Sequence, residues 1–516
     1  MEFSRRLVLG MLPGSIGATC FAKFAAASDD KKTVVFVDAI DTTDWDPAVA
    51  YGPESRVLLN IYDTLLFYNS NTGKLEANLA TEWSVSADGL SWTFKLRPGV
   101  KFHGGETMTA AGLKQIMERN IKAGTGAHYL WAPVSEITAP DELTLVITTN
   151  APAPIDMIAS GQYTSKVYSP AAAVKGADWF SAGNGDGTGP YKVVQWVKGQ
   201  QIVLERHKDY WRGWKGDEFD RVVVRVVSEV STQLQMIRSG EADFIISSLP
   251  YDMLDKLKGE EGIEVGIFKS WMNVVSNINV KKYPTDNLKF RQALTHIMDY
   301  ATVSSQIYGG YGTVPTGPVP SALPHAPKLA MPAFDLEKAK ALLKDSGVPE
   351  KDWSITYVSY NGVAAIENIT LLFQALAAQV GVRVELVKGD WGVVWDKQKQ
   401  LETSANIYPF RNWPDYPTSI NEAQIMFRTE DKVLYNLGYY SNPKVDQLID
   451  TAVKLEATDK EAAAKAVNEA YQIVLDDAAA LFIVDNPRAV VYRNNISGVD
   501  MPAAYETVWF RLLKRT

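Results

Sequence analysis

The sequence predicts an α/β fold with more than one domain, and three observations carry this prediction. The chain has 516 residues, which exceeds what one hydrophobic core usually supports. Short β-branched runs recur along it, near 33–37, 222–227, 244–247, 382–387 and 481–484. Helical stretches separate these runs, and strands that alternate with helices are typical of layered α/β domains.

A β-hairpin is expected around residue 89. Asp88-Gly89 is a tight-turn dipeptide that lies between two alternating runs. Because successive side chains of a strand point to opposite faces, Trp92, Phe94 and Leu96 are predicted to share one buried face.

The helices follow from apolar periodicity and from their first residues. Thr109 is a candidate N-cap for an amphipathic helix. A second helix is expected from Glu367 to just before Gly381, and surface helices are expected near 445–455 and 460–475. The apolar face of the second helix is predicted to carry Leu371, Leu372, Ala375 and Leu376.

Composition and charge exclude two classes of partner. Hydrophobic residues make up 46% and charged residues 22% of the chain, as in an ordinary globular protein. The formal net charge is −8, whereas nucleic-acid binding requires a basic surface that neutralises phosphates. No run of Lys and Arg indicates a polybasic membrane-binding segment.

Residues 1–27 resemble an export signal. Arg5 and Arg6 precede a short apolar run, and alanines at 25–27 end it. The paired arginines are similar to those of the twin-arginine route, and the general secretory route stays open. A lipid anchor on Cys20, the only cysteine, is not expected, because Gly17 and Thr19 do not fit the residues that precede a lipidated cysteine.

No metal, cofactor or catalytic motif is apparent in the sequence. The five histidines are scattered without a paired spacing, and no zinc cluster or nucleophile elbow occurs. The glycine-rich stretch 183–189 lacks the Lys-Ser/Thr ending of a P-loop. No catalytic residue is therefore assigned from these motifs. A secreted carbohydrate-active enzyme stays open as the alternative, because its two carboxylates need not be close in sequence.

The stretch 410–417 combines groups that suit ligand binding. It holds the cation of Arg411, the indole of Trp413, the carboxylate of Asp415 and the phenol of Tyr416. Two prolines exclude a helix interior, so a stiff loop is expected. The stretch is then either a ligand-binding loop or an irregular turn whose rings cover a neighbouring core.

Several motifs occur in the order that is typical of one family. They are the hairpin region 82–105, the Gly-Thr-Gly-Pro-Tyr stretch 187–191 with the following 203–211, the turn 239–243, and the helices that begin near 290 and 335. In this order they resemble the bacterial extracellular solute-binding proteins of family 5. Members of that family serve ABC importers of peptides, nickel and related solutes. The resemblance covers nearly the whole chain beyond the export signal.

The resemblance implies a two-lobed periplasmic-binding-protein fold of type II, with an extra domain inserted in lobe one. Two crossover strands would join the lobes. Mapped onto this chain, lobe one takes residues 28–60, 185–267 and 486–516, the inserted domain takes 61–184, and lobe two takes 268–485.

The resemblance also implies a function without catalysis, so we expect a protein that is not an enzyme. We expect a monomer in the periplasm that captures a di- or oligopeptide by hinge closure and delivers it to the transmembrane subunits of an ABC permease. An opine, an oligosaccharide or another amine-bearing solute stays open. Nickel and haem are disfavoured because 410–417 contains no histidine, and no cofactor is expected.

The resemblance assigns roles within 410–417. Asp415 aligns with an aspartate that holds the terminal ammonium of a peptide in peptide-binding relatives. Trp413 and Tyr416 flank it and would contact the ligand. Arg411 has two open interpretations, since it would either bind a ligand carboxylate or pair with Asp415.

Three further rings are second candidates for the ligand pocket. Trp45 and Tyr51 follow the first strand, and Trp271 lies just past the expected first crossover. Each ring lies in or near a loop that is expected to face the cleft. Packing in a core is the alternative for each of them.

Overall fold

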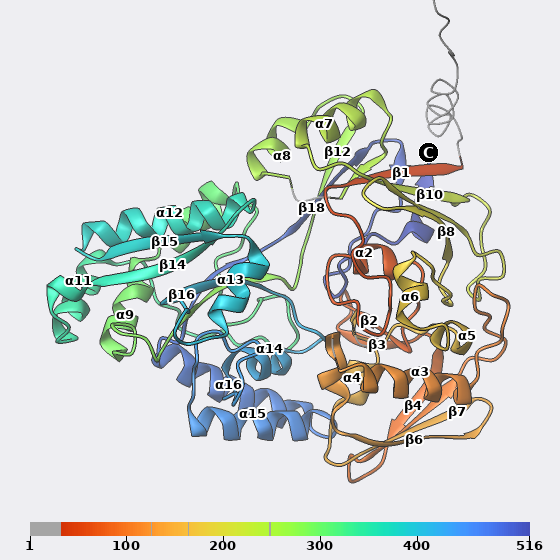
Figure 1. The fold of residues 1–516 in the computed structure, drawn as a ribbon, viewed down its shortest axis with the longest axis horizontal. Coiled ribbons are helices and arrows are strands. Elements are labelled where there is room, and N and C mark those ends of the chain that lie inside the picture. Colours follow the sequence, from red (N-terminus) through yellow and green to blue (C-terminus); the bar gives the residue numbers. More distant parts are fainter. Residues whose placement is uncertain (1–31, 125, 164, 247–248) are drawn as a thin grey trace, which may run out of the picture.

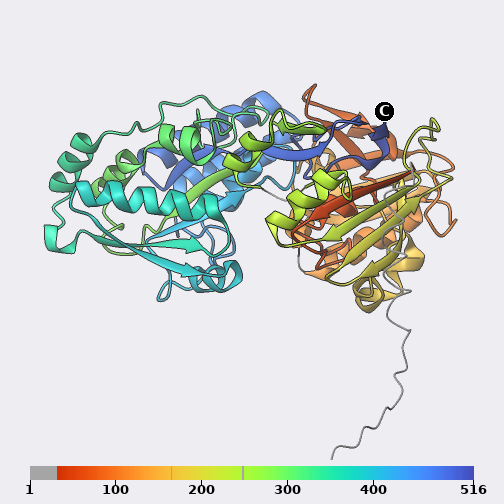
Figure 2. The same ribbon diagram turned by 90° about the horizontal axis from the view of Figure 1, so that it is seen from above.

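The computed structural model describes residues 32–124, 126–163, 165–246 and 249–516. The expected export signal and its paired arginines lie outside the described residues. The described chain forms two bodies that lie side by side, and it runs between them more than once (Figures 1 and 2).

The first body is built on a seven-stranded sheet with the order β12-β18-β11-β1-β10-β9-β8. Its strands are β1 (Thr33–Asp38), β8 (Tyr191–Val197), β9 (Gln201–Arg206), β10 (Arg221–Val226), β11 (Phe244–Ile245), β12 (Ile263–Phe268) and β18 (Arg488–Arg493). Strand β1 pairs in parallel with β10 and β11, and all six of its residues are buried. Its unbroken β-branched run is what a strand covered on both faces requires. Helices α7 (Val230–Ser239) and α8 (Tyr251–Leu257) pack at one end of this sheet.

The elements between β1 and β8 form a separate layer below this sheet in Figure 1. A four-stranded antiparallel sheet has the order β4-β5-β7-β6, and a hairpin of β2 and β3 lies beside it. The strands are β2 (Leu66–Asn69), β3 (Lys74–Ala77), β4 (Ala80–Val85), β5 (Ser91–Leu96), β6 (Val134–Asp141) and β7 (Thr144–Thr149). The helices are α2 (Ser55–Leu58), α3 (Ala110–Ala123), the 3-10 helix η2 (Gly126–Trp131), α4 (Ile155–Ile158), α5 (Pro170–Ala173) and α6 (Gly176–Ser181).

Two local predictions for this layer are confirmed. Strands β4 and β5 pair antiparallel around residue 89, and Trp92, Phe94 and Leu96 are buried as the alternation requires. The side-chain oxygen of Thr109 accepts a hydrogen bond from the Gly112 amide at 3.1 Å, so Thr109 caps α3.

The second body is built on a five-stranded sheet with the order β15-β14-β16-β13-β17. Its strands are β13 (Asn273–Ile278), β14 (Ser354–Tyr360), β15 (Arg383–Gly389), β16 (Ile407–Asn412) and β17 (Ala480–Asp485). Its larger helices are α9 (Leu288–Ile297), α11 (Leu336–Asp345), α12 (Ala364–Gln379), α13 (Trp391–Gln398), α14 (Ser419–Phe427), α15 (Pro443–Glu456) and α16 (Lys460–Asp476). Shorter pieces are α10 (Tyr300–Thr302), the π-helical η3 (Val303–Ile307) and the 3-10 helix η4 (Glu350–Asp352).

The two faces of this sheet are covered by different helices. Val274 and Val484 share a core with α9, α11 and α12. On the other face Val275 and Phe482 share a core with α14, α15 and α16. That second core continues into the first body, so the helices α14–α16 connect the two bodies by apolar packing.

The predicted apolar face of α12 is wrong. The buried residues are Ile366, Ile369, Thr370, Phe373 and Ala377, a stripe with spacings of three and four. Leu371 is 47% exposed and Leu372 is half-buried. This helix is apolar on most sides, so periodicity in the sequence identifies a helix without choosing which stripe meets the sheet.

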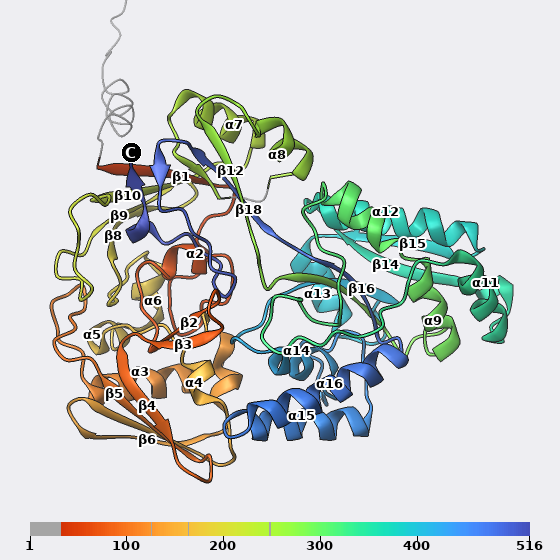
Figure 3. The ribbon, with the colours of Figure 1, turned by 180° about the vertical axis from the view of Figure 1, so that it is seen from behind.

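Two connections join the sheets of the two bodies (Figure 3). Strand β12 leads through 269–272 into β13, and β17 leads through 486–487 into β18. Asn412 at the end of β16 lies opposite Asn273, and Asn273 lies opposite Asp485. The end of β16 is therefore placed beside both connections, at the edge of the second body that faces the first.

The C-terminal segment returns to the first body. The short strands β19 (Ile496–Ser497) and β20 (Lys514–Arg515) pair antiparallel, and the 3-10 helix η5 (Phe510–Leu512) precedes the last strand. Of the helices within the described ranges, none reaches both the length and the apolar character of a membrane span. The exact domain boundaries given above stay a prediction.

Candidate functional site

The stretch 410–417 is half strand and half loop. Strand β16 extends through Asn412, so the expectation of a loop over the whole stretch is corrected. The chain then passes through 413–417 to Thr418, whose hydroxyl accepts a hydrogen bond from the Ile420 amide at 3.2 Å and caps α14. The loop is thus fixed by a strand at one end and a capped helix at the other.

Asp415 is the centre of this loop. Its side chain is almost completely buried, with 1% of the residue exposed. The Tyr51 hydroxyl donates a hydrogen bond to Oδ1 at 2.5 Å, and the Tyr129 hydroxyl donates one to Oδ2. The Asp415 amide donates to Oδ1 of Asn421 at 2.8 Å, which holds the backbone of the loop against α14.

These contacts join the two bodies. Tyr51 lies just before α2 and Tyr129 lies in η2, both in the first body, whereas Asp415 belongs to the second. Of the residues that the sequence proposed, the structure brings Asp415 and Tyr51 together. A buried carboxylate needs such donors, because a charge taken out of water without partners is costly.

The electrostatics of the carboxylate follow from this burial. Burial raises the pKa of Asp415 to about 6, although the hydroxyls of Tyr129 and Tyr51 act in the opposite direction. Burial and the charge of Asp415 raise the pKa of both tyrosines well above their usual value. At neutral pH the site is therefore an ionised carboxylate that accepts bonds from two neutral phenols.

Aromatic rings surround the carboxylate. The centroid of the Tyr435 ring lies 6.5 Å from that of Tyr51 and 6.3 Å from that of Tyr129. The Tyr163 ring lies 4.7 Å from that of Tyr51. All four tyrosine rings are half-buried, so they present both apolar faces and polar edges near the carboxylate.

The rings continue from the carboxylate toward solvent. Trp395 of α13 lies 5.9 Å from Tyr435 and 5.6 Å from Phe410, measured between ring centroids. Trp391 stacks on Trp395 at 5.2 Å and is 52% exposed. An amphipathic ligand would find stacking surfaces along this series of rings.

Arg411 does not pair with Asp415 in this structure. Among the described residues it makes no ion pair, and its Nη2 lies 3.4 Å from the Met272 sulfur. Burial lowers the pKa of Arg488, and the nearby charge of Arg411 lowers it further. Arg488 itself bonds Glu506 at 2.5 Å. Arg411 is thus a half-buried cation in a basic surrounding, which is suited to an anionic group.

The other candidates from the stretch are packed residues. Trp413 is 8% exposed, and the Arg488 guanidinium lies 5.9 Å from the centroid of its ring. Tyr416 is 2% exposed, and its hydroxyl donates to Glu456 at 3.3 Å. Tyr416 therefore points toward α15 and not toward the partners of Asp415.

Trp45 and Trp271 also lie in the core. Trp45 has no exposed surface and packs against Trp196 at 5.6 Å. The indole of Trp271 donates to the Ala322 carbonyl at 3.0 Å and meets Tyr68 edge-on at 5.4 Å. The structure supports the packing alternative for both residues.

Sequence reasoning did not find Tyr129, Tyr163, Tyr435 and Asn421. The chain has 23 tyrosines, and these three have no special spacing or motif. Tyr129 reaches Asp415 across 286 residues of sequence, a separation that no local pattern encodes. Within the described ranges, no group of three or more His, Cys, Asp or Glu side chains has the geometry for a metal ion.

Comparisons with known proteins give a consistent result. The sequence model of the family described as bacterial extracellular solute-binding proteins, family 5 Middle, matches residues 74–432. The chain is similar to a probable D,D-dipeptide-binding periplasmic protein of Escherichia coli, with 28% identity over 485 residues and 92% of each chain covered. It is also similar to a glutathione-binding protein of Pectobacterium atrosepticum, with 27% identity and 86% of each chain covered.

Solved structures share the fold. A periplasmic binding protein of Helicobacter pylori in complex with the peptide STSA has a TM-score of 0.80 at 23% identity, over 94% of this chain and 98% of that one. A Brucella suis protein in complex with Fe(III)-EDTA has a TM-score of 0.84 at 20% identity, over 94% and 100%. At these identities the likeness concerns the fold alone.

The burial of Asp415 predicts a stability effect that depends on pH. Because its pKa is raised in the folded state, the folded protein binds this proton more tightly than the unfolded chain does. Stability is then lost as the pH rises from about 4 through about 6. Asp415→Asn removes this loss, so it should stabilise the ligand-free protein by up to about 3 kcal/mol at pH 8 and by little at pH 4. Urea unfolding at both pH values measures this, and a destabilised variant at pH 8 would contradict it.

The two phenols predict an effect on the pKa of Asp415. Tyr129→Phe removes a donor to Oδ2, so the pKa of Asp415 should rise further. NMR titration of the protein with ¹³C-labelled aspartate reads this shift directly. Tyr163→Phe is the matched control, since Tyr163 packs on the Tyr51 ring while the Asp415 oxygens bond Tyr51 and Tyr129. An equal shift in both variants would show that the Tyr129 hydroxyl has no specific role.

Proposed function

We propose that this chain, which belongs to the bacterial extracellular solute-binding proteins of family 5, captures a peptide between its two bodies. Asp415 holds the terminal ammonium of the peptide in this proposal. The family and the similar proteins are substrate-binding proteins of importers and not enzymes. Accordingly, the chain delivers its solute to the transmembrane subunits of an ABC permease. We propose further that it works in the periplasm and carries out no chemical step.

The observation that carries this proposal is the position of the Asp415 carboxylate. It is buried where the two bodies meet, and both of its hydrogen-bond donors come from the opposite body. An ammonium group has three donors and full charge, so it makes stronger, charge-assisted bonds to a carboxylate than neutral phenols do. A ligand ammonium would therefore enter between Asp415 and the two tyrosines and draw both bodies together.

The names of similar proteins support a peptide as the solute. The curated relatives are named for D,D-dipeptides and for glutathione, and two of the solved structures hold the peptides STSA and RPPGFSPFR. Another solved structure of this fold holds agropinic acid, so an opine is the second candidate. The ligand screen described below distinguishes a peptide or an opine from an oligosaccharide or another amine-bearing solute.

Arg411 provides the second anchor in this proposal. It lies four residues before Asp415, so their Cα atoms are at most about 14 Å apart. It makes no ion pair with a described carboxylate, and its surroundings are basic through Arg488. A ligand with an ammonium at one end and a carboxylate at the other would match both groups. The ring surfaces of Tyr435 and Trp395 would contact its side chains with little discrimination between sequences.

The two connections between the sheets suit a hinge. Rotation about 269–272 and 486–487 would open the contact between Asp415 and the two tyrosines without disturbing either sheet. Ligand binding then favours the closed arrangement, because the ligand bonds groups from both bodies only in that state.

A thermal-shift screen tests the solute class. Di- to hexapeptides should raise the melting temperature by mass action, whereas oligosaccharides and nickel should not. Asp415→Asn should weaken the best peptide at least about tenfold, or roughly 1.4 kcal/mol. A sugar that shifts the melt while no peptide does would reject the peptide assignment, and an unchanged dissociation constant in the variant would reject Asp415 as the anchor.

A cycle that combines one protein variant with one change in the ligand tests whether Arg411 binds the ligand carboxylate. Arg411→Gln should weaken a peptide with a free carboxylate about tenfold and should leave its C-terminal amide unchanged. Calorimetric titration of both ligands into both proteins measures the coupling. Arg428→Gln is the control, because Arg428 bonds Asp450 on the surface of the second body. Equal losses for acid and amide would show that Arg411 contributes to folding and not to recognition.

A further inference from the structure

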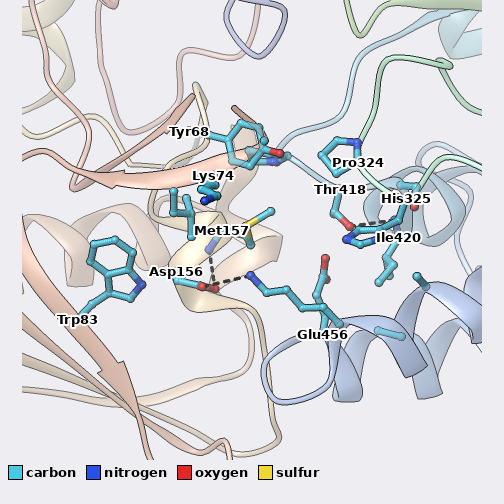
Figure 4. Close-up of a pocket in the computed structure, with 17 residues that line it drawn as sticks. Tyr68, Lys74, Trp83, Asp156, Met157, Pro324, His325, Thr418, Ile420 and Glu456 are labelled. Atoms are coloured by element: carbon cyan, nitrogen blue, oxygen red, sulfur yellow. Dashed lines mark hydrogen bonds and ion pairs between the residues drawn. The ribbon is translucent and has the colours of Figure 1, made fainter. Parts of the chain in front are cut away.

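A cavity of about 360 Å³ lies on the other side of the loop that carries Asp415. The first body contributes the β2–β3 hairpin, β4 and α4, and the second contributes 417–420, the end of α15 and the start of α16 (Figure 4). The cavity thus has one wall from each body, and it exists in this form only when the bodies are together.

Two buried carboxyl groups form the inner surface of the cavity. Asp156 of α4 is 6% exposed and Glu456 of α15 is 4% exposed. Their side chains point into the cavity from opposite bodies (Figure 4). Burial raises the pKa of both groups, that of Glu456 to about 7. A cation bound between the two groups would favour their ionised forms.

The cation that is present is held loosely. Lys460 Nζ lies 3.9 Å from Asp156 Oδ2, at the limit of an ion pair, and the Lys460 side chain is 51% exposed. Within the described part of the chain, neither Asp156 nor Glu456 makes another ion pair. The Tyr416 hydroxyl donates a hydrogen bond to Glu456 at 3.3 Å, and the Thr418 side chain also hydrogen-bonds Glu456. The half-exposed ammonium of Lys460 is thus the cation that the protein itself places near the two buried acids.

The remaining surface of the cavity is suited to an aliphatic chain. Met157, Ile420 and Ala463 line it with apolar atoms, and the rings of Tyr68 and Trp83 stand at its sides. Lys74 and His325 lie at its rim and are exposed, so salt and solvent screen their repulsion of a cation. A metal ion fits less well, because the two carboxyl groups lack a third acidic or histidine ligand among the described residues.

We propose that this cavity is a second binding site, for a small aliphatic amine, and that the amine takes the place of the Lys460 ammonium between Asp156 and Glu456. Because the two carboxyl groups come from different bodies, an amine bound here favours the closed arrangement. The loop 417–420 forms one wall of the cavity and follows Asp415 directly, so the two sites are coupled through the same closure. The site is independent of the identity of the solute at Asp415.

Titration calorimetry of the purified protein at pH 8 tests the proposal, with n-butylammonium and 1,4-diaminobutane as probes and 1-butanol as the uncharged control. We expect both amines to bind and butanol not to bind. Glu456→Gln and Asp156→Asn should each weaken the amines at least about tenfold. Lys460→Gln should tighten them several-fold, because it removes the competing ammonium. This opposite sign separates competition for a binding site from a structural role.

Two further variants keep the outcome decisive. Ala464→Leu fills the cavity without changing its charge and should abolish amine binding. Asp415→Asn should retain measurable amine binding, with an affinity that changes only as far as the closure equilibrium changes. The amine concentration is varied in tenfold steps up to roughly 10 mM, a range that covers even weak sites. If the wild-type protein gives no heat of binding over this range, the proposal is rejected. Loss of binding in the Asp415 variant alone would place the amine at the Asp415 site and would equally reject a second site.

Discussion

The burial of one carboxylate between two bodies is the constraint on which the rest of this structure depends. Asp415 is 1% exposed and ionised at neutral pH, so its oxygens must receive hydrogen bonds. Its own loop does not provide them, since the loop amide is directed to Asn421. The donors are Tyr51 and Tyr129 of the opposite body, which makes the contact between the bodies a condition for burying the charge.

The two sheets explain why this carboxylate lies at the boundary. Asn412, Asn273 and Asp485 form one row across β16, β13 and β17, beside both connections between the bodies. Any residue that follows β16 by a few positions is therefore carried to the edge that faces the first body. Arg411, one position before this row, acts on Arg488 of the other sheet, so the boundary carries a carboxylate at Asp415 and a cation at Arg411. This polarity suits a zwitterionic ligand and a hinge-closing protein.

One loop serves both proposed sites. Asp415 faces the tyrosines of the first body, whereas 417–420 forms a wall of the cavity that contains Asp156 and Glu456. The Tyr416 hydroxyl bonds Glu456, so the residue next to the proposed anchor contacts the proposed amine site. Both sites take carboxyl groups whose pKa is raised by burial, and both are complete only when the bodies meet. Occupation of either site would thus favour the same closed state.

The class of fold, the hairpin with Trp92 and the N-cap of α3 could be predicted from the sequence, because turn dipeptides, alternation and capping act over a few residues. It also led to the prediction that Asp415 binds the ligand, because an acidic residue in a proline-stiffened loop resembled a family motif. Which stripe of α12 is buried, and which rings reach the carboxylate, depend on packing between elements that are far apart in the sequence. Tyr51 and Tyr129 lie 364 and 286 residues from Asp415. Their contacts arise from how the two bodies meet, and no local periodicity carries that information.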